Sequence, residues 1–213
     1  MRFFSYDSKF SQVLLHLSMA CWLNILWFVC SIPIITIGAS TTALYACTLK
    51  IADGIDGEIT KRFFSSFRQN FAQATRVWLI LLAAGLLIGA DTYIAVHLRS
   101  SSTGVPAVFW TLNLALLFVI GIVYVIILLY IFPLISKFSN TDFNMFKNSL
   151  LIGIRYLFCT IMLFAVHFAM FFLVVAVFTP LIIFGEGLCA LLCSYLMINV
   201  MRNVAYHADE EQA

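Results

Sequence analysis

Long stretches without a single charged residue are the feature that most restricts how this chain can fold. They lie at 10–49, 77–90, 100–136, 156–185 and 187–201. A helix that spans a bilayer needs about 20 apolar residues, and most of these stretches have room for at least one. Because 63% of the 213 residues are apolar and only 10% are charged, a water-soluble domain could not bury them. We therefore expect an all-α integral membrane protein.

The distribution of basic residues indicates how often the chain crosses the membrane. Hydropathy marks six candidate helices, at 11–32, 34–50, 76–98, 106–135, 156–178 and 181–201. Cytoplasmic flanks of membrane helices attract Lys and Arg. If all six cross and the N-terminus is cytoplasmic, 11 of the 12 basic residues lie inside and only Arg99 lies outside. The prediction is a single membrane domain over 1–213, a polytopic bundle of six transmembrane helices with both termini in the cytoplasm.

The second candidate helix is short and rich in small and hydroxyl-bearing residues. Residues 34–49 rise about 24 Å as a helix, against roughly 30 Å of hydrocarbon, so neighbouring helices must shelter its outer end. Its small-residue face is either a seam for close helix packing or a hydroxyl-lined pathway. A GxxxG pair in the third helix offers a second close-approach face. The residues of these two faces are Gly38, Ser40, Thr41, Thr42, Gly85 and Gly89.

Two segments that each precede an outward-going helix resemble each other. They lie at 63–79 and 142–158, and in both the apolar residues recur every three or four positions. This spacing predicts amphipathic helices on the cytoplasmic surface, with aromatic side chains in the membrane interface. The N-terminal "RFFSYDSKF" at 2–10 echoes "RFFSSFRQNF" at 62–71 and also precedes an outward-going helix, so the six helices are expected to form three helical hairpins. The aromatic faces consist of Phe64, Phe67, Phe71, Phe143 and Phe146.

Motifs of known enzymes are absent from the sequence. It has no HExxH, P-loop, GxSxG or strand-linked GxGxxG pattern, so we expect no enzyme activity and no cofactor. An intramembrane enzyme would need Ser40 or Thr41 beside His167 as nucleophile and base. The six cysteines all lie in apolar segments without a CxxC or a neighbouring His, and they are expected to be packing residues that bind no metal. A net charge of +2 is too small to indicate a nucleic-acid partner.

Four polar residues within the apolar segments are candidates for a solute or proton site: Asp91, Glu186, His167 and Asn24. Ionisable groups in a membrane are costly and commonly functional. Asp91 and Glu186 lie about 22 and 24 Å along their helices from the cytoplasmic ends, which predicts a shared level and an outward-facing acidic pocket. The alternatives are structural: a carboxylate near a helix start, a pairing of Asp91 with Arg99 or His97, or single interhelical hydrogen bonds.

Four short sequences mark the first 100 residues: "FFSYDSKF" at 3–10, "WLNILW" at 22–27, "PIITIGASTTALYACTLKIADG" at 33–54 and "RFFSSFRQNFAQATRVWLILL" at 62–82. Together they resemble the YesL-like family of bacterial membrane proteins. The resemblance implies a small polytopic protein of unassigned function, of a kind often encoded beside carbohydrate ABC-transporter components and polysaccharide-degrading enzymes. It implies no catalytic or binding residues. The positions that match the family pattern include Asn24, Trp27, Gly38, Thr42, Phe64, Phe67 and Asn70.

Two functions fit these features. The first is a non-enzymatic accessory or assembly partner in ABC-type carbohydrate uptake, with the lipid bilayer and permease subunits as partners. It follows from the resemblance and from the missing catalytic motifs. The alternative is a small stand-alone transporter or channel for a polar solute that uses the acidic pocket. Either protein is expected in the bacterial inner (cytoplasmic) membrane.

Overall fold

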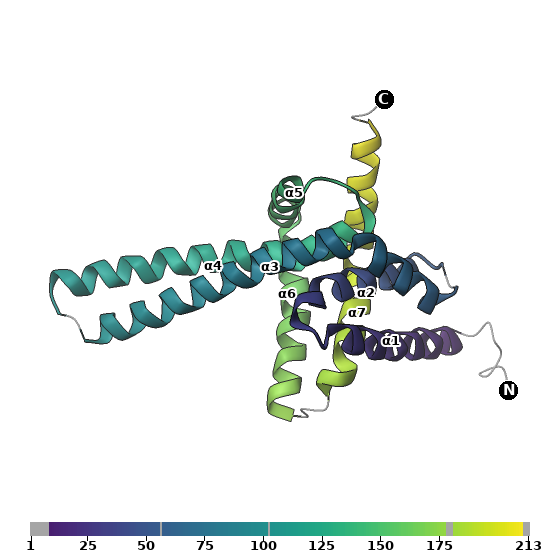
Figure 1. The fold of residues 1–213 in the computed structure, drawn as a ribbon, viewed down its shortest axis with the longest axis horizontal. Coiled ribbons are helices and arrows are strands. Elements are labelled where there is room, and N and C mark those ends of the chain that lie inside the picture. Colours follow the sequence, from purple (N-terminus) through teal and green to yellow (C-terminus); the bar gives the residue numbers. More distant parts are fainter. Residues whose placement is uncertain (1–8, 56, 102, 178–180, 211–213) are drawn as a thin grey trace.

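The computed structural model describes residues 9–55, 57–101, 103–177 and 181–210, and within these ranges the chain is helical and has no strand (Figure 1). Its α-helices are α1 (Lys9–Ser31), α2 (Ile37–Ala52), α3 (Ile59–Ser100), α4 (Val105–Lys137), α5 (Asp142–Arg155), α6 (Leu157–Phe172) and α7 (Leu181–Glu210). A 3₁₀ turn, Ile34–Thr36, leads into α2, and a π-helical turn, Leu173–Val177, follows α6.

Six helical segments among the described residues are long and apolar enough to cross a membrane. They are Ser11–Ser31, Ile34–Ala52, Ile59–Ser100, Val105–Lys137, Leu157–Ala176 and Gly185–Tyr206. Each overlaps one of the six segments that hydropathy marks. The prediction of an all-α polytopic membrane protein is therefore confirmed.

Helix α2 is the centre of the molecule. It contacts α1, α3, α4 and α7, and 61% of its most apolar stretch is buried inside the protein, compared with 11% for α3. Small side chains let neighbouring helix backbones approach α2 closely. The short second crossing is consequently surrounded by protein, which supplies the shelter that its length requires.

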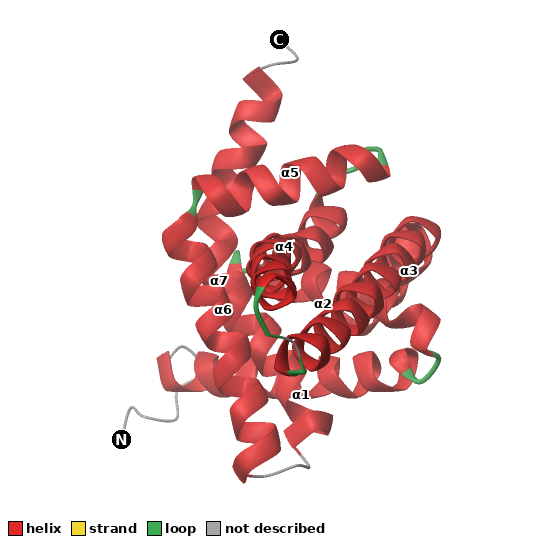
Figure 2. Cartoon of the chain, turned by 90° about the vertical axis from the view of Figure 1, so that its left-hand side faces the viewer, coloured by secondary structure: helices red, strands yellow, loops and turns green. Residues whose placement is uncertain are grey.

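The helices do not all run parallel to one another. In Figure 1, α3 and α4 lie side by side and run across the direction of α6 and α7, and the end where α3 and α4 are joined projects away from the other helices. Figure 2 looks along α4 and shows α5 crossing over it. A depth counted along α3 is therefore not comparable with a depth counted along α7.

The two similar amphipathic segments fold differently. The first continues without interruption into the long helix α3. The second forms the separate helix α5, which ends where Tyr156 leaves helical geometry with φ −111° and ψ 50°. The expected equivalence of the two segments is thus wrong, because one is the start of a crossing helix and the other lies across α4. Consecutive helices still pair as α1 with α2, α3 with α4 and α6 with α7.

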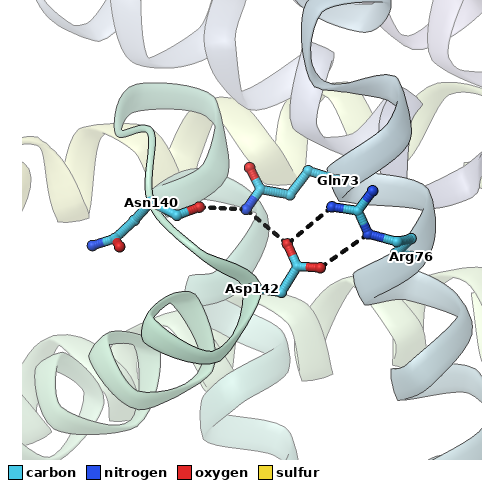
Figure 3. Close-up of polar contacts among 4 residues, drawn as sticks. All are labelled: Gln73, Arg76, Asn140 and Asp142. Carbon is cyan, nitrogen blue, oxygen red and sulfur yellow. Dashed lines mark hydrogen bonds and ion pairs between the residues drawn. The ribbon is translucent and has the colours of Figure 1, made fainter.

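A polar clamp fixes the start of α5 to α3 (Figure 3). The Gln73 amide donates to the backbone carbonyl of Asn140 at 2.7 Å and to Asp142 Oδ1 at 3.0 Å. Arg76 Nε donates to Asp142 Oδ2 at 3.0 Å. The Arg76 guanidinium, helped by Gln73, lowers the pKa of the Asp142 carboxyl below its ordinary value. The clamp and the short loop from α4 together hold the start of α5 in place.

A second ion pair lies where basic residues of α2, α4 and α7 come together. Arg202 of α7 donates from Nε to Asp53 Oδ1 at 3.2 Å, just beyond the end of α2. This hydrogen bond lowers the pKa of Asp53, and the charges of Lys137 and Lys50 act in the same direction. The ends of α2 and α4 therefore meet the last third of α7 on one side of the molecule.

Candidate functional site

Polar side chains from α1, α2, α6 and α7 meet in the interior of the helix assembly. We call this group the intramembrane polar cluster. Five of its members interact with one another by hydrogen bonds or electrostatically, and the sixth, Asn24, binds the backbone N–H of Gly187 next to Glu186. Each of the four helices contributes at least one of them. The cluster consists of Asn24, Tyr45, His167, Glu186, Cys189 and Cys193.

Three members of the cluster share one face of α7. Glu186, Cys189 and Cys193 are spaced by three and four residues, which places them one above another along the helix. Both cysteines are buried, with at most 1% of their surface exposed, and Glu186 is partly buried. A carboxyl group and two thiols therefore lie in a row along one face of α7.

His167 reaches this line from α6. Its Nδ1 lies 3.6 Å from Cys193 Sγ and 2.9 Å from the carbonyl oxygen of Leu163. The imidazole also interacts with the Cys189 thiol and is within electrostatic range of the Glu186 carboxyl group. Since a backbone carbonyl can only accept, the contact with Leu163 places a proton on Nδ1 and leaves the lone pair on Nε2.

Asn24 is the member of the cluster that α1 contributes. Its side chain is fully buried, and its Oδ1 accepts a hydrogen bond from the backbone N–H of Gly187. A Cβ at Gly187 would collide with the Ala20 carbonyl and with Asn24, and one at Gly185 would come within 2.8 Å of Met170 Sδ. The glycines on either side of Glu186 therefore let α7 approach α1 and α6 closely, and α7 continues through this stretch unbroken.

The structure brings together three of the four predicted site residues and leaves out the fourth. Glu186, His167 and Asn24 belong to the cluster. Asp91 is exposed and lies nine residues before the end of α3. The end where α3 joins α4 projects away from α6 and α7 (Figure 1). Asp91 and Glu186 thus do not face one another. The inference of a shared level assumed parallel helices, and α3 crosses α7 instead.

Three cluster residues were missed by sequence reasoning. The sequence predicts that Cys189 and Cys193 are packing residues because no His is near them along the chain, and Tyr45 is one of several tyrosines with no motif around it. The imidazole comes from another helix. The available signal was the spacing of the two cysteines together with a lone His in the preceding apolar segment.

The small-residue face of α2 packs against both α1 and α3. A Cβ added to Gly38 would be 2.5 Å from both the Ala74 carbonyl and the Trp78 Cβ. The hydroxyls beside it are bonded within the protein. Ser40 donates to the Thr36 carbonyl, Thr42 donates to the Gly38 carbonyl, and Thr41 accepts from the Trp27 indole at 3.0 Å. These contacts favour packing over a hydrated path along this face.

The two glycines of the third-helix pair have different surroundings. A Cβ on Gly85 would be 2.7 Å from the Tyr124 hydroxyl of α4, whereas a Cβ on Gly89 would meet no atom within 4 Å. Only Gly85 therefore lies at a close approach between α3 and α4. The Tyr124 hydroxyl donates to the Leu81 carbonyl and links the two helices there.

The aromatic faces are divided between core and surface. Phe67 and Phe146 pack against the buried core. Phe64 and Phe71 are each 39% exposed, and Phe143 is 77% exposed. Of these five residues, only Phe64, Phe71 and Phe143 can therefore contact lipid or another protein.

An apolar groove of about 800 Å³ opens between α3, α4 and α6, and we call it the lateral groove. Its lining is almost entirely aliphatic and aromatic, with Leu117, Gly121, Ile161 and Phe164 among the residues. A Cβ on Gly121 would meet no atom within 4 Å. The groove has the apolar character of a surface that contacts lipid chains or another membrane helix.

Comparison with known proteins gives relatives whose function is also unassigned. A family model described as "Protein of unknown function, DUF624" matches residues 20–92. Two proteins of Bacillus subtilis (strain 168) are similar over most of their length. Uncharacterized protein YteU is 26% identical over 193 residues, covering 89% of this chain and 83% of the relative. Uncharacterized protein YesL is 24% identical over 196 residues, covering 90% and 89%. No solved structure matches. These similarities confirm the resemblance inferred from the sequence.

Proposed function

We propose that this chain, a YesL-like protein by its similarity over most of its length, is a non-enzymatic accessory or assembly partner in ABC-type carbohydrate uptake. It would reside in the bacterial cytoplasmic membrane with both termini inside. The carbohydrate context rests on the genetic neighbourhood that the resemblance implies. The partner would be a permease subunit of such a transporter.

The observation that carries the proposal is the lateral groove on the side of the projecting α3–α4 pair. The chain's own side chains leave the groove unfilled. Only 11% of the most apolar stretch of α3 is buried inside the protein. Apolar surface alone does not drive association in lipid, whereas a shaped groove with a glycine at its floor permits close helix packing. We propose that a transmembrane helix of the permease occupies it.

The test is to fill the groove without disturbing the fold. Gly121→Leu places a side chain in the groove, and no atom of the chain obstructs its Cβ. Gly89→Leu is the matched control, because its Cβ is equally unobstructed and Gly89 does not line the groove. The tagged wild-type protein and Gly89→Leu should co-purify with ABC permease subunits from native membranes, and Gly121→Leu should not.

Equal recovery of permease subunits with both variants would contradict the groove as the binding surface. Failure of the wild-type protein to recover any ABC subunit, after crosslinking in intact cells, would contradict the accessory function itself. Size-exclusion profiles in detergent show whether each variant remains folded.

A stand-alone transporter is the second candidate, and the partly buried carboxyl of Glu186 on the membrane-embedded part of α7 favours it. In this case purified protein in liposomes should carry a polar solute, tested with a panel of plant-polysaccharide sugars, and Glu186→Gln should abolish the flux. Flux by the protein alone would displace the accessory function as the leading proposal. Its absence, together with co-purified permease, would support the accessory function.

A further inference from the structure

We propose that His167, Cys189 and Cys193 bind a thiol-seeking d¹⁰ metal ion, Zn²⁺ or Cu⁺, within the membrane-embedded part of the protein. Each residue offers one ligand atom, and these three atoms lie within 4.8 Å of one another. The site does not include the lateral groove, so the metal proposal and the proposed function are tested separately.

The geometry is close to that of a coordination site. Ligand atoms bound at about 2.0 Å for nitrogen and about 2.3 Å for sulfur are roughly 3.5 to 3.8 Å apart around a tetrahedral ion. The present separations of up to 4.8 Å require the side chains to converge by about 1 Å. Rotations about side-chain bonds supply such a shift without moving α6 or α7.

The ligands are held in place by their helices. Cys189 and Cys193 are four residues apart on α7 and buried, so both sulfurs point to the same side. His167 is oriented by the contact of Nδ1 with the Leu163 carbonyl at 2.9 Å. The same ring nitrogen lies 3.6 Å from Cys193 Sγ, so the imidazole is already within reach of the sulfurs.

Charge balance explains why a metal can be stable in this interior. On binding, the two thiols release their protons to solvent and become thiolates, so Zn²⁺ with two thiolates and a neutral imidazole has no net charge. Cu⁺ with the same ligands has one negative charge, and soft thiolates favour either ion over harder cations. Tyr45, which is hydrogen-bonded to Cys193, offers a supporting contact to that sulfur.

Two other cysteines show how these thiols differ from ordinary buried ones. Cys47 donates to the Ile59 carbonyl and Cys159 to the Leu196 carbonyl, both at 3.7 Å. These are the contacts of small packing residues. Cys189 and Cys193 instead face each other and an imidazole, the combination of soft ligands that zinc and copper prefer.

The full-length protein, purified in detergent with a chelator and then dialysed, can be equilibrated with Zn²⁺ or, under anaerobic reducing conditions, with Cu⁺. Bound metal is measured by mass spectrometry, and dissociation constants are measured by competition with a chelating dye. We expect one ion per chain. Cys189→Ala, Cys193→Ala and His167→Ala should each weaken binding by more than the roughly 10- to 100-fold typical of a lost supporting residue.

The matched control is a variant with the other four cysteines replaced by Ala: Cys21, Cys30, Cys47 and Cys159. It should bind the ion as the wild-type protein does. Stoichiometric binding that survives in the three ligand variants, or is lost in the four-cysteine control, would place the metal elsewhere and overturn the proposal. Failure of the wild-type protein to bind either ion would also overturn it.

A second measurement does not depend on how well each variant folds. In the wild-type protein, bound metal should slow alkylation of Cys189 and Cys193 by N-ethylmaleimide and leave Cys21 unaffected, as followed by peptide mass spectrometry. Replacement by Co²⁺ should give a thiolate-to-metal charge-transfer absorption band. Unchanged alkylation and no such band would contradict coordination by these thiols.

Discussion

Gly38 shows how one residue decides the packing of the central helix. The backbone of α3 at Ala74 and the Cβ of Trp78 occupy the space where a side chain would begin. Trp78 also donates from its indole to the Ile34 carbonyl at 2.7 Å, which holds α3 against the start of the second crossing. The close approach of α2 and α3 therefore depends on the absence of a Cβ at this position.

Gly38→Ala is expected to lower the free energy of unfolding by about 1 to 3 kcal/mol, because backbone atoms must move to admit the methyl group. Gly89→Ala is the control. Its Cβ meets no atom within 4 Å, so it should be neutral or slightly stabilising through helix propensity. Unfolding by sodium dodecyl sulfate in mixed micelles, followed by circular dichroism, measures both. Equal stability of the two variants would mean that α2 and α3 do not meet as described.

Asp142 makes a pH-dependent contribution at the surface. Its pKa is lowered in the folded protein by Arg76 and Gln73, so its stabilising effect is complete above its unfolded pKa of about 4 and is lost as the pH falls through the lower folded value. Asp142→Asn should therefore be less stable than the wild-type protein at pH 7 and match it at strongly acidic pH. The clamp is partly exposed, so the difference is expected to be small.

Thermal melts of both proteins across this pH range test the effect. Arg76→Gln should reproduce the loss at pH 7, and the double variant should lose little more than either single one. Additive losses would indicate that the two residues act separately.

At the scale of helices, similar sequence patterns produced different structures. Residues 63–75 and 142–154 share their aromatic spacing, yet the first belongs to a 42-residue helix and the second to a separate 14-residue helix. The difference arises at Tyr156, whose backbone leaves the helical region, and at the clamp that ties α5 to α3. Amphipathic spacing predicts that a segment is helical, and it does not determine whether the helix continues.

The contact between α2 and α7 can be tested through one buried hydrogen bond. The Ser194 hydroxyl donates to Thr48 Oγ1 at 2.8 Å, and both residues are fully buried. Thr48→Val should leave the Ser194 hydroxyl without this partner and destabilise the protein by about 1 to 3 kcal/mol. The double variant with Ser194→Ala should be more stable than the sum of the two single losses predicts. The same unfolding titration measures this coupling, and a coupling energy near zero would contradict the contact.

At the scale of the whole molecule, the placement of basic residues agrees with the packing of helix ends. Lys50, Lys137 and Arg202 come from three helices and surround Asp53. The charge distribution assigns these same residues to the cytoplasmic side. The charge distribution and the packing therefore place the same residues on one side of the molecule. The orientation of the protein in the membrane is a proposal.

Cysteine labelling measures the orientation. Ser101→Cys follows α3 and Ser139→Cys follows α4, and both positions are exposed. A membrane-impermeant maleimide added to intact bacterial cells should label Ser101→Cys only, and disrupted cells should allow both to be labelled. The chain with its native cysteines alone supplies the background. Labelling of Ser139→Cys in intact cells would reverse the proposed orientation.

The sequence by itself was sufficient for the class of the protein: helical, embedded in a membrane, with six candidate crossings and a short second one. These properties depend on hydrophobicity and on charge at helix ends, which are local along the chain. Only the tertiary structure showed that α3 and α4 cross α6 and α7, and this separates Asp91 from Glu186. It also brought His167 of α6 to Cys189 and Cys193 of α7. Contacts between helices depend on crossing directions and on the close approaches that glycines such as Gly38 and Gly187 permit, and these are set by the packing of all the helices together.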